Sequence, residues 1–221
     1  MRYLLNAAGV FPLLALISAL LYVPVAFFLH RRTRPQLIRH IANYLLLGYT
    51  VSLLWAVFCW AMPKAELADA PLRARLNLTP GAEWLRAYRE DGGAWSSQVM
   101  WNIFLFMPFG ALLPCVFPAL RHRAWGTVVI CLVLTVLIEC VQAMLGRVAD
   151  IDDVFCNTVG GIGGVCGYVV VSHWFRNVSW TSPVLELPKS RGATVAAYLG
   201  LLCILLVPTV FDLLLHAGLL G

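Results

Sequence analysis

The sequence predicts an all-α membrane protein, a helical bundle of about six transmembrane helices. Of its 221 residues, 61% are hydrophobic and only 12% are charged, whereas a soluble domain carries about 25% charged residues. The mean hydropathy is +0.81. Because a helical span needs about 20 apolar residues, the chain has room for five or six spans and little else.

Apolar stretches place these spans at about 7–29, 41–62, 98–120, 124–145, 154–175 and 193–220. The first run continues to Leu29 without a small-residue cleavage site, which predicts a retained span. The chain then divides into two N-terminal helices (1–62), an extracytoplasmic loop (63–97), a core of three helices (98–175), and a cytoplasmic loop with the last helix (176–221).

Lysine and arginine predict the orientation of the bundle. The loops at 30–40, 121–123 and 176–191 hold four, two and three of them, whereas the short opposite segments hold only Arg2 and Arg147. Such residues gather on the cytoplasmic side. We therefore expect a multi-pass protein of the inner (cytoplasmic) membrane with both termini outside. The net charge of +5 then reflects topology, and we expect no nucleic-acid partner.

Within the long loop, residues 79–90 predict a short helix, with Thr79 as its N-cap and Pro80 at its first position. Trp84, Leu85 and Tyr88 share one face. This helix is expected either to lie flat on the membrane surface or to be an ordinary solvated loop helix.

Several classes of site are excluded. The chain has no P-loop and no serine or cysteine nucleophile motif. Its seven cysteines are an odd number without a C-x-x-C pair, and they read as small buried hydrophobes. The glycines of T-V-G-G-I-G-G-V-C-G would lie in mid-membrane, where Gly160 with Gly164 and Gly163 with Gly167 predict close helix packing.

The stretch Ile138–Gly164 holds an unusual set of polar residues between two apolar runs. A charged side chain inside a bilayer costs roughly 2.5 to 3.5 kcal/mol, so such a set indicates a functional site. The third span begins on the same side, and three helix ends should converge there. The candidate residues are Asn102, Glu139, Gln142, Arg147, Asp150, Asp153 and Asn157.

Three chemistries fit these residues. Glu139, Asp150 and Asp153 could act as catalytic acid and base. Asn102, Gln142, Arg147 and Asn157 could bind a substrate, with the guanidinium of Arg147 on a phosphate or carboxylate. A divalent cation on the oxygens of Glu139, Asp150, Asp153 and Asn157 is possible, although their spacing does not by itself define a metal site.

Structural roles compete with these interpretations. Asp152 is expected to be a helix cap, and Arg147 could form an ion pair with one of the aspartates. Asp212 and His216 read as a pair at the end of the last helix, on the same side of the membrane, and could join the site. Pro108 could kink the third span and open it locally to polar groups.

The ordered motifs resemble the VanZ-like family of membrane proteins over about 98–175. They are N-x-x-x-F-x-P-x-G (Asn102, Phe106, Pro108, Gly110), E-x-x-Q (Glu139, Gln142) and R-x-x-D-x-x-D-x-x-x-N-x-x-G (Arg147, Asp150, Asp153, Asn157, Gly160). The family is named after a member linked to low-level teicoplanin resistance, which implies action at the envelope surface. It does not name a reaction.

The resulting hypothesis is a protein that binds or processes a lipid-linked, phosphate-bearing envelope intermediate, with a membrane lipid or such a precursor as its partner. Glu139 would be its acid or base and Arg147 would bind the phosphate. Two alternatives remain open. One is a small proton-coupled transporter in which Glu139 relays protons, and the other is a non-enzymatic scaffold for envelope machinery.

Overall fold

The computed structural model describes residues 17–18, 20, 22, 37–59, 71–90, 92–94, 98–186 and 191–217. Five helices among them are long and apolar enough to cross a membrane, which confirms the all-α membrane bundle. They are α2 (Leu37–Cys59), α5 (Gln98–Val116), α6 (Ala124–Met144), α7 (Ile151–Trp174) and α8 (Arg191–His216). The span expected at about 7–29 lies almost entirely outside the described residues.

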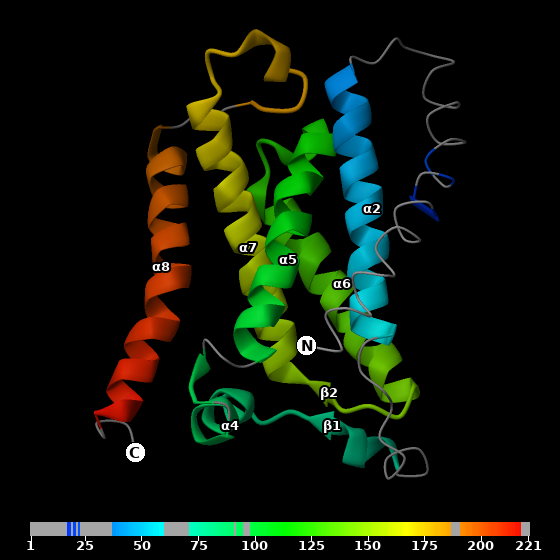
Figure 1. Cartoon of the computed structure of the whole chain (residues 1–221), viewed down its shortest axis with the longest axis vertical. Helices are drawn as coiled ribbons and strands as arrows, with labels where there is room; N and C mark the ends of the chain where they lie inside the picture. The colour runs from blue at the N-terminus through cyan, green and yellow to red at the C-terminus, as the bar shows by residue number, and fades with distance from the viewer. Residues whose placement is uncertain are drawn as a thin grey trace.

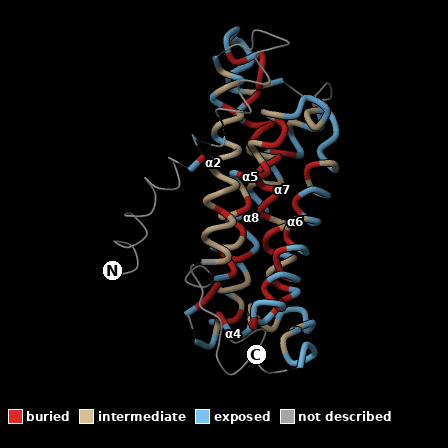
Figure 2. The backbone as a smooth tube through the Cα atoms, turned by 90° about the vertical axis from the view of Figure 1, so that its right-hand side faces the viewer, coloured by how far each residue is buried: buried red, intermediate tan, exposed pale blue. Residues whose placement is uncertain are grey.

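Helices α5 and α7 form the centre of the bundle, with α6 behind α5 and with α2 and α8 on opposite flanks (Figure 1). Buried residues concentrate along the central helices, while the outer faces of the flanking helices are exposed (Figure 2). This pattern suits a bundle whose outer surface faces lipid. Residues that are shielded from lipid therefore lie mainly on the central helices.

Glycines bring α5 and α7 into backbone contact. A Cβ atom on Gly160 would lie 2.3 Å from the carbonyl oxygen of Ile103, and one on Gly164 would lie 2.2 Å from that of Met107. The predicted packing role of these two glycines is confirmed. The second predicted pair is only half right, because Gly163 packs near Ile204 and Met107 whereas a Cβ on Gly167 would meet nothing within 4 Å.

Helix α5 runs through Pro108 as one helix. Proline supplies no amide for the carbonyl of Phe104, four residues earlier. The hydroxyl of Tyr49 on α2 donates to the adjacent carbonyl of Leu105 at 2.6 Å. A neighbouring helix thus supplies a polar contact beside the proline, at the place where a local opening was expected.

Helix α7 starts at Ile151, about three residues earlier than predicted. Asp150 is its N-cap, and the side chain of this aspartate accepts a hydrogen bond from the amide of Asp152 at 2.8 Å. The polar turn after α6 therefore supplies the first turn of α7.

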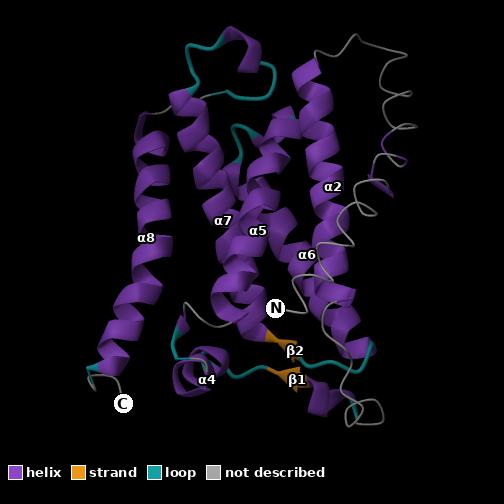
Figure 3. Cartoon of the chain, in the orientation of Figure 1, coloured by secondary structure: helices purple, strands orange, loops and turns teal. Residues whose placement is uncertain are grey.

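A segment of the long loop lies across the end of the bundle where α5 and α7 begin (Figure 3). We call residues 71–90 and 92–94 the strap. It contains a 3-10 turn (Leu72–Arg75), strand β1 (Leu76–Asn77) and helix α4 (Ala82–Glu90). Strand β1 pairs in parallel with β2 (Ala149–Asp150), with Leu76 opposite Ala149 and Asn77 opposite Asp150.

Helix α4 starts at Ala82 rather than at Pro80, and it packs against the bundle. Ala87 is buried in a cluster with Val99, Met100 and Cys156, and Trp84 packs against the same cluster. The helix is therefore docked on the ends of the spans and is not solvated on all sides, while its position at the membrane surface stays a prediction.

At the opposite end of the bundle, Arg121 joins the end of α5 to the loop that follows α7. Its guanidinium donates to the carbonyls of Pro114 at 3.1 Å, Cys115 at 3.3 Å and Pro183 at 2.7 Å. One arginine thus satisfies the last turn of α5 and ties it to the loop that follows α7.

Candidate functional site

The polar candidates gather at the strap end of the bundle, and most of them are buried. Glu139 and Gln142 are each 5% exposed, and Asn157 is 4% exposed. Asn102, Arg147 and Asp153 are half-buried. A pocket open to the outside was the expectation, but Glu139, Gln142 and Asn157 are buried, and the strap lies across this end of the bundle, where it contacts Asp150 and Asp152 (Figure 3).

Glu139 and Gln142 face each other one turn apart on α6, as their spacing predicted. The Glu139 Oε2 atom accepts a hydrogen bond from the amide of Asp150 at 2.9 Å. In the orientation that satisfies both neighbours, the Gln142 amide donates to Glu139 Oε2 at 3.3 Å and accepts from Arg147 Nη1 at 2.9 Å. Gln142 therefore bridges the buried carboxyl group and the arginine.

Arg147 is held by neutral acceptors. Its Nη1 atom also donates to the carbonyl of Val57, in the last turn of α2, at 2.6 Å. Within the described part of the chain, no carboxylate oxygen forms an ion pair with Arg147, so the ion pair with an aspartate is not observed. Both bonds use Nη1, and the carboxyl groups of Glu139 and Asp153 lie near enough to interact with the charge of the guanidinium without forming an ion pair.

Asp150 has a structural role at this site. Its Oδ1 atom accepts from the amide of Asp152, and its Oδ2 atom accepts from the side-chain amide of Asn77 at 2.8 Å. The first contact caps α7 and the second ties the strap to α7. Asp150 also positions Glu139 through its own main-chain amide.

Asp152 is a helix cap, as expected, but of a different helix. Its carboxylate oxygens accept from the amides of Gly81 at 2.8 Å and Glu83 at 2.9 Å, at the start of α4. The position of Asp152 in the sequence predicted that it caps α7, its own helix, but the N-cap of α7 is Asp150. The two donors are main-chain amides about 70 residues away in the chain. Because they are not side chains, no pattern of residue types could have predicted this contact.

Asp153 and Asn102 confirm that the third and fifth predicted spans converge. The side-chain amide of Asn102 donates to Asp153 Oδ1 at 2.5 Å. One turn deeper on α7, the amide of Asn157 donates to the hydroxyl of Thr135 at 2.8 Å. The Oδ1 atom of Asn157 is buried and has no hydrogen-bond partner among the described residues.

Thr135 is a site residue that the sequence analysis missed. It is completely buried, and it lies four residues before Glu139 on the same face of α6. A threonine in an apolar helix usually bonds to its own backbone, as Thr158 does here at 2.7 Å. Only its position one turn from Glu139 could have identified it.

Asp212 and His216 do not join Glu139 and Arg147. Asp212 accepts from the amide of Ala94 in the strap at 2.8 and 3.0 Å. The His216 Nδ1 atom lies 2.7 Å from the main-chain oxygen of Asp212 rather than from its carboxylate. Both residues serve the contact between α8 and the strap.

The donor set does not fit a metal ion. Among the described residues, no group of three or more histidine, cysteine, aspartate or glutamate side chains is arranged to hold one. The oxygens of Asp150 and Asp152 instead face N–H donors. The site therefore combines the guanidinium of Arg147, the carboxyl groups of Glu139 and Asp153, and the side-chain amides of Asn102, Gln142 and Asn157.

A cavity of about 330 Å³ lies at the other end of the bundle, beyond the C-terminal half of α7. Its lining residues are Ser172, Phe175, Arg176, Val178, Thr181, Ser182, Leu185 and Glu186. None of the predicted site residues contributes to it.

Comparison with known proteins agrees with the motifs. The model of the VanZ/LLP1 family matches residues 45–176, which is more than half of the chain. The match extends from α2 to the end of α7, so it includes every candidate residue and the strap, but not Asp212. No curated protein and no solved structure matches the chain.

Proposed function

The chain belongs to the VanZ/LLP1 family, and we propose that it binds a lipid-linked, phosphate-bearing intermediate of the cell envelope at the strap end of the bundle. The observation that carries the proposal is the surroundings of Arg147. Neutral acceptors at Val57 and Gln142 hold this arginine, and no described carboxylate pairs with it.

An arginine held in this way suits an anionic group. A guanidinium binds phosphate through two parallel hydrogen bonds, which are stronger than those between neutral groups. Only Nη1 of Arg147 has a described acceptor, so Nε and Nη2 are left for a ligand. The apolar outer faces of the helices would accommodate the lipid tail beside this head group.

Two carboxyl groups lie beside the arginine and could process the bound intermediate. Glu139 connects to Arg147 through Gln142, and Asp153 is held by Asn102. Glu139 would act as acid or base, with Asp153 and Asn157 orienting the substrate. We assign Asp150 to positioning, because both of its carboxylate oxygens are occupied.

We place the strap end on the outer face of the cytoplasmic membrane, because lysine and arginine gather in the short loops at the other end. The 63–97 loop is discounted, since its five basic residues are balanced by five acidic ones and the charge rule weakens with loop length. The link of the family's namesake to teicoplanin resistance implies action at this face. A contribution to teicoplanin resistance would then follow from binding the precursor or changing its accessibility.

Purified protein in nanodiscs tests the proposal, with a polyprenyl phosphate as the probe and the matching polyprenol as the control ligand. We expect the phosphate to bind and the alcohol to bind much more weakly. Arg147→Ala should weaken phosphate binding about tenfold or more, since a hydrogen bond to a charged group contributes about 1.5 to 3 kcal/mol.

The matched control is Arg176→Ala, an exposed arginine at the other end of the bundle, which should leave affinity unchanged. Equal affinity of the wild type, Glu139→Gln and Arg147→Ala for the phosphate would contradict the proposal.

Proton-coupled transport is less well supported. A relay from Glu139 would need a polar path to the other end of the bundle, but the helices close together below Asn157. A Cβ on Gly161 would lie 2.6 Å from the sulfur of Cys131, and one on Gly110 would lie 2.4 Å from the carbonyl oxygen of Gly161. Helices α5, α6 and α7 are thus in direct contact at this level.

A further inference from the structure

The geometry points to the strap as a lid that two aspartates, Asp152 on α7 and Asp212 on α8, hold closed over the buried carboxyl groups. A ligand would reach Glu139 only after the strap is released. This inference rests on the proposed function, since it concerns access to the same site, but its test needs no substrate.

The first attachment holds the start of α4. Asp152 accepts from the amides of Gly81 and Glu83, which are among the donors that a helix N-terminus leaves without partners inside the helix. A carboxylate there also complements the helix dipole. Asp152, the neighbour of Asp153 in the sequence, therefore holds the N-terminal end of α4.

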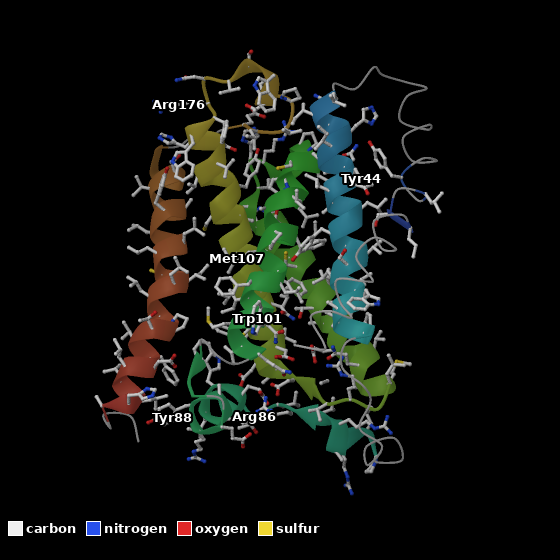
Figure 4. The ribbon with its side chains drawn as sticks, in the orientation of Figure 1. Tyr44, Arg86, Tyr88, Trp101, Met107 and Arg176 are labelled. Atoms are coloured by element: carbon white, nitrogen blue, oxygen red, sulfur yellow. The ribbon has the colours of Figure 1, made fainter. Side chains whose placement is uncertain are left out.

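The second attachment holds the other end of α4. Asp212 accepts from the amide of Ala94, and a Cβ on Gly93 would lie 2.9 Å from its Oδ2 atom. The hydroxyl of Tyr88 donates to the carbonyl of Leu215 at 2.9 Å. Figure 4 shows Tyr88 at the end of α4 nearest α8.

Between these attachments, α4 packs on the bundle through Trp84 and Ala87. Trp84 meets Phe211 edge to face with ring centroids 5.4 Å apart, and Ala87 lies in the cluster that contains Cys156. An isolated helix shorter than about 12 residues is marginal in water. The nine residues of α4 therefore depend on these contacts.

The two attachments differ in kind from the interior of the bundle. Helices α5 and α7 meet backbone to backbone at Gly160 and Gly164, and they cannot part without opening the core. The strap is held by hydrogen bonds at one end of the bundle. Asp152 and Asp212 bond to its main-chain amides, strand β1 pairs with β2, Asn77 donates to Asp150, and Arg75 donates to the carbonyl of Ala143. A few such hydrogen bonds contribute much less to stability than the packed core of the bundle, so the strap can open while the bundle stays folded.

Cys156 is a native reporter of this opening. It is completely buried in the cluster beneath α4, three residues after Asp153. In a protein that keeps Cys156 as its only thiol, the rate of modification by a charged methanethiosulfonate reagent measures how often the strap lifts. We expect slow modification of Cys156 when the strap has its wild-type attachments.

Asp152→Ala and Asp212→Ala should each accelerate modification of Cys156 about tenfold or more, and the double variant should exceed both. Glu90→Ala, which removes an exposed carboxylate of α4, should have no effect. A second protein keeps only Cys131, which is completely buried between α6 and α7. Its modification should stay slow in all these backgrounds.

Unchanged rates at Cys156 would overturn the inference, and so would equal acceleration at Cys131, which would indicate unfolding of the whole bundle. The result is separable from the test of function. If Cys156 modification accelerates but polyprenyl phosphate does not bind, the lid inference is supported and the proposed ligand is rejected. If polyprenyl phosphate binds but modification does not accelerate, the proposed ligand is supported and the lid inference is rejected.

Discussion

The side-chain amide of Asn102 lies 2.5 Å from Asp153 Oδ1 and joins residues 51 positions apart in the chain. This contact joins the second turn of α5 to the first turn of α7, at the end of the bundle where the strap lies. It also satisfies one carboxylate oxygen in a half-buried position. The contact therefore serves both the fold and the proposed site.

Replacing Asn102 by alanine should destabilise the protein. The change leaves an oxygen of the half-buried Asp153 without its donor, and the loss of one intramolecular hydrogen bond costs about 1 kcal/mol. Unfolding in mixed micelles would measure the loss. Gln98→Ala, at an exposed position in the first turn of α5, is the control and should stay close to wild type.

Asp150→Ala should cost more than Asp150→Asn. The alanine variant removes both the N-cap of α7 and the bond from Asn77, and loss of an N-cap alone typically costs about 1 kcal/mol. Asparagine keeps an acceptor for the amide of Asp152 and is among the preferred N-cap residues. Equal loss of unfolding free energy in the two variants would argue against the capping role.

Gly164→Ala and Gly167→Ala form a matched pair on one helix. A Cβ at position 164 would lie 2.2 Å from the carbonyl oxygen of Met107, whereas one at position 167 would meet nothing within 4 Å. Overpacking costs typically about 1 to 3 kcal/mol, and a backbone atom cannot move aside as a side chain can. Gly164→Ala should therefore lower stability strongly, while Gly167→Ala should be neutral or slightly stabilising. Thermal unfolding in detergent would separate them.

Arg121→Lys should destabilise the far end of the bundle. A lysine cannot reproduce the planar guanidinium that donates to the carbonyls of Pro114, Cys115 and Pro183. We expect a loss of about 1 to 3 kcal/mol in unfolding free energy. Arg123→Lys, at an exposed position two residues later, should cause no loss, and a similar loss in both variants would contradict this role for Arg121.

Much of the fold follows from local properties of the sequence. Hydropathy located α5 and α6 to within a few residues, because a membrane span needs a fixed length of apolar helix whose backbone bonds are all internal. The spacing of Gly160 and Gly164 predicted the close approach of α5 and α7. The cost of burying Glu139 and Arg147 identified the region of the candidate site before any contact was known.

The strap could not be predicted in this way. Its contacts with α7 and α8 use the main-chain amides of Gly81, Glu83 and Ala94, and a main-chain amide is present at every residue except proline. The partner of Asp152 is therefore undetermined by residue type or spacing.

By itself, the sequence determined a helical membrane bundle, its family motifs, and the cluster around Glu139 and Arg147. Only the tertiary structure decided that Asp152 caps α4, that Asp212 holds the strap, and that the cluster is covered. The physical reason is the range of the forces involved. Apolar length and helical period act between near neighbours in the chain, whereas these hydrogen bonds join groups that meet only when the whole bundle is assembled.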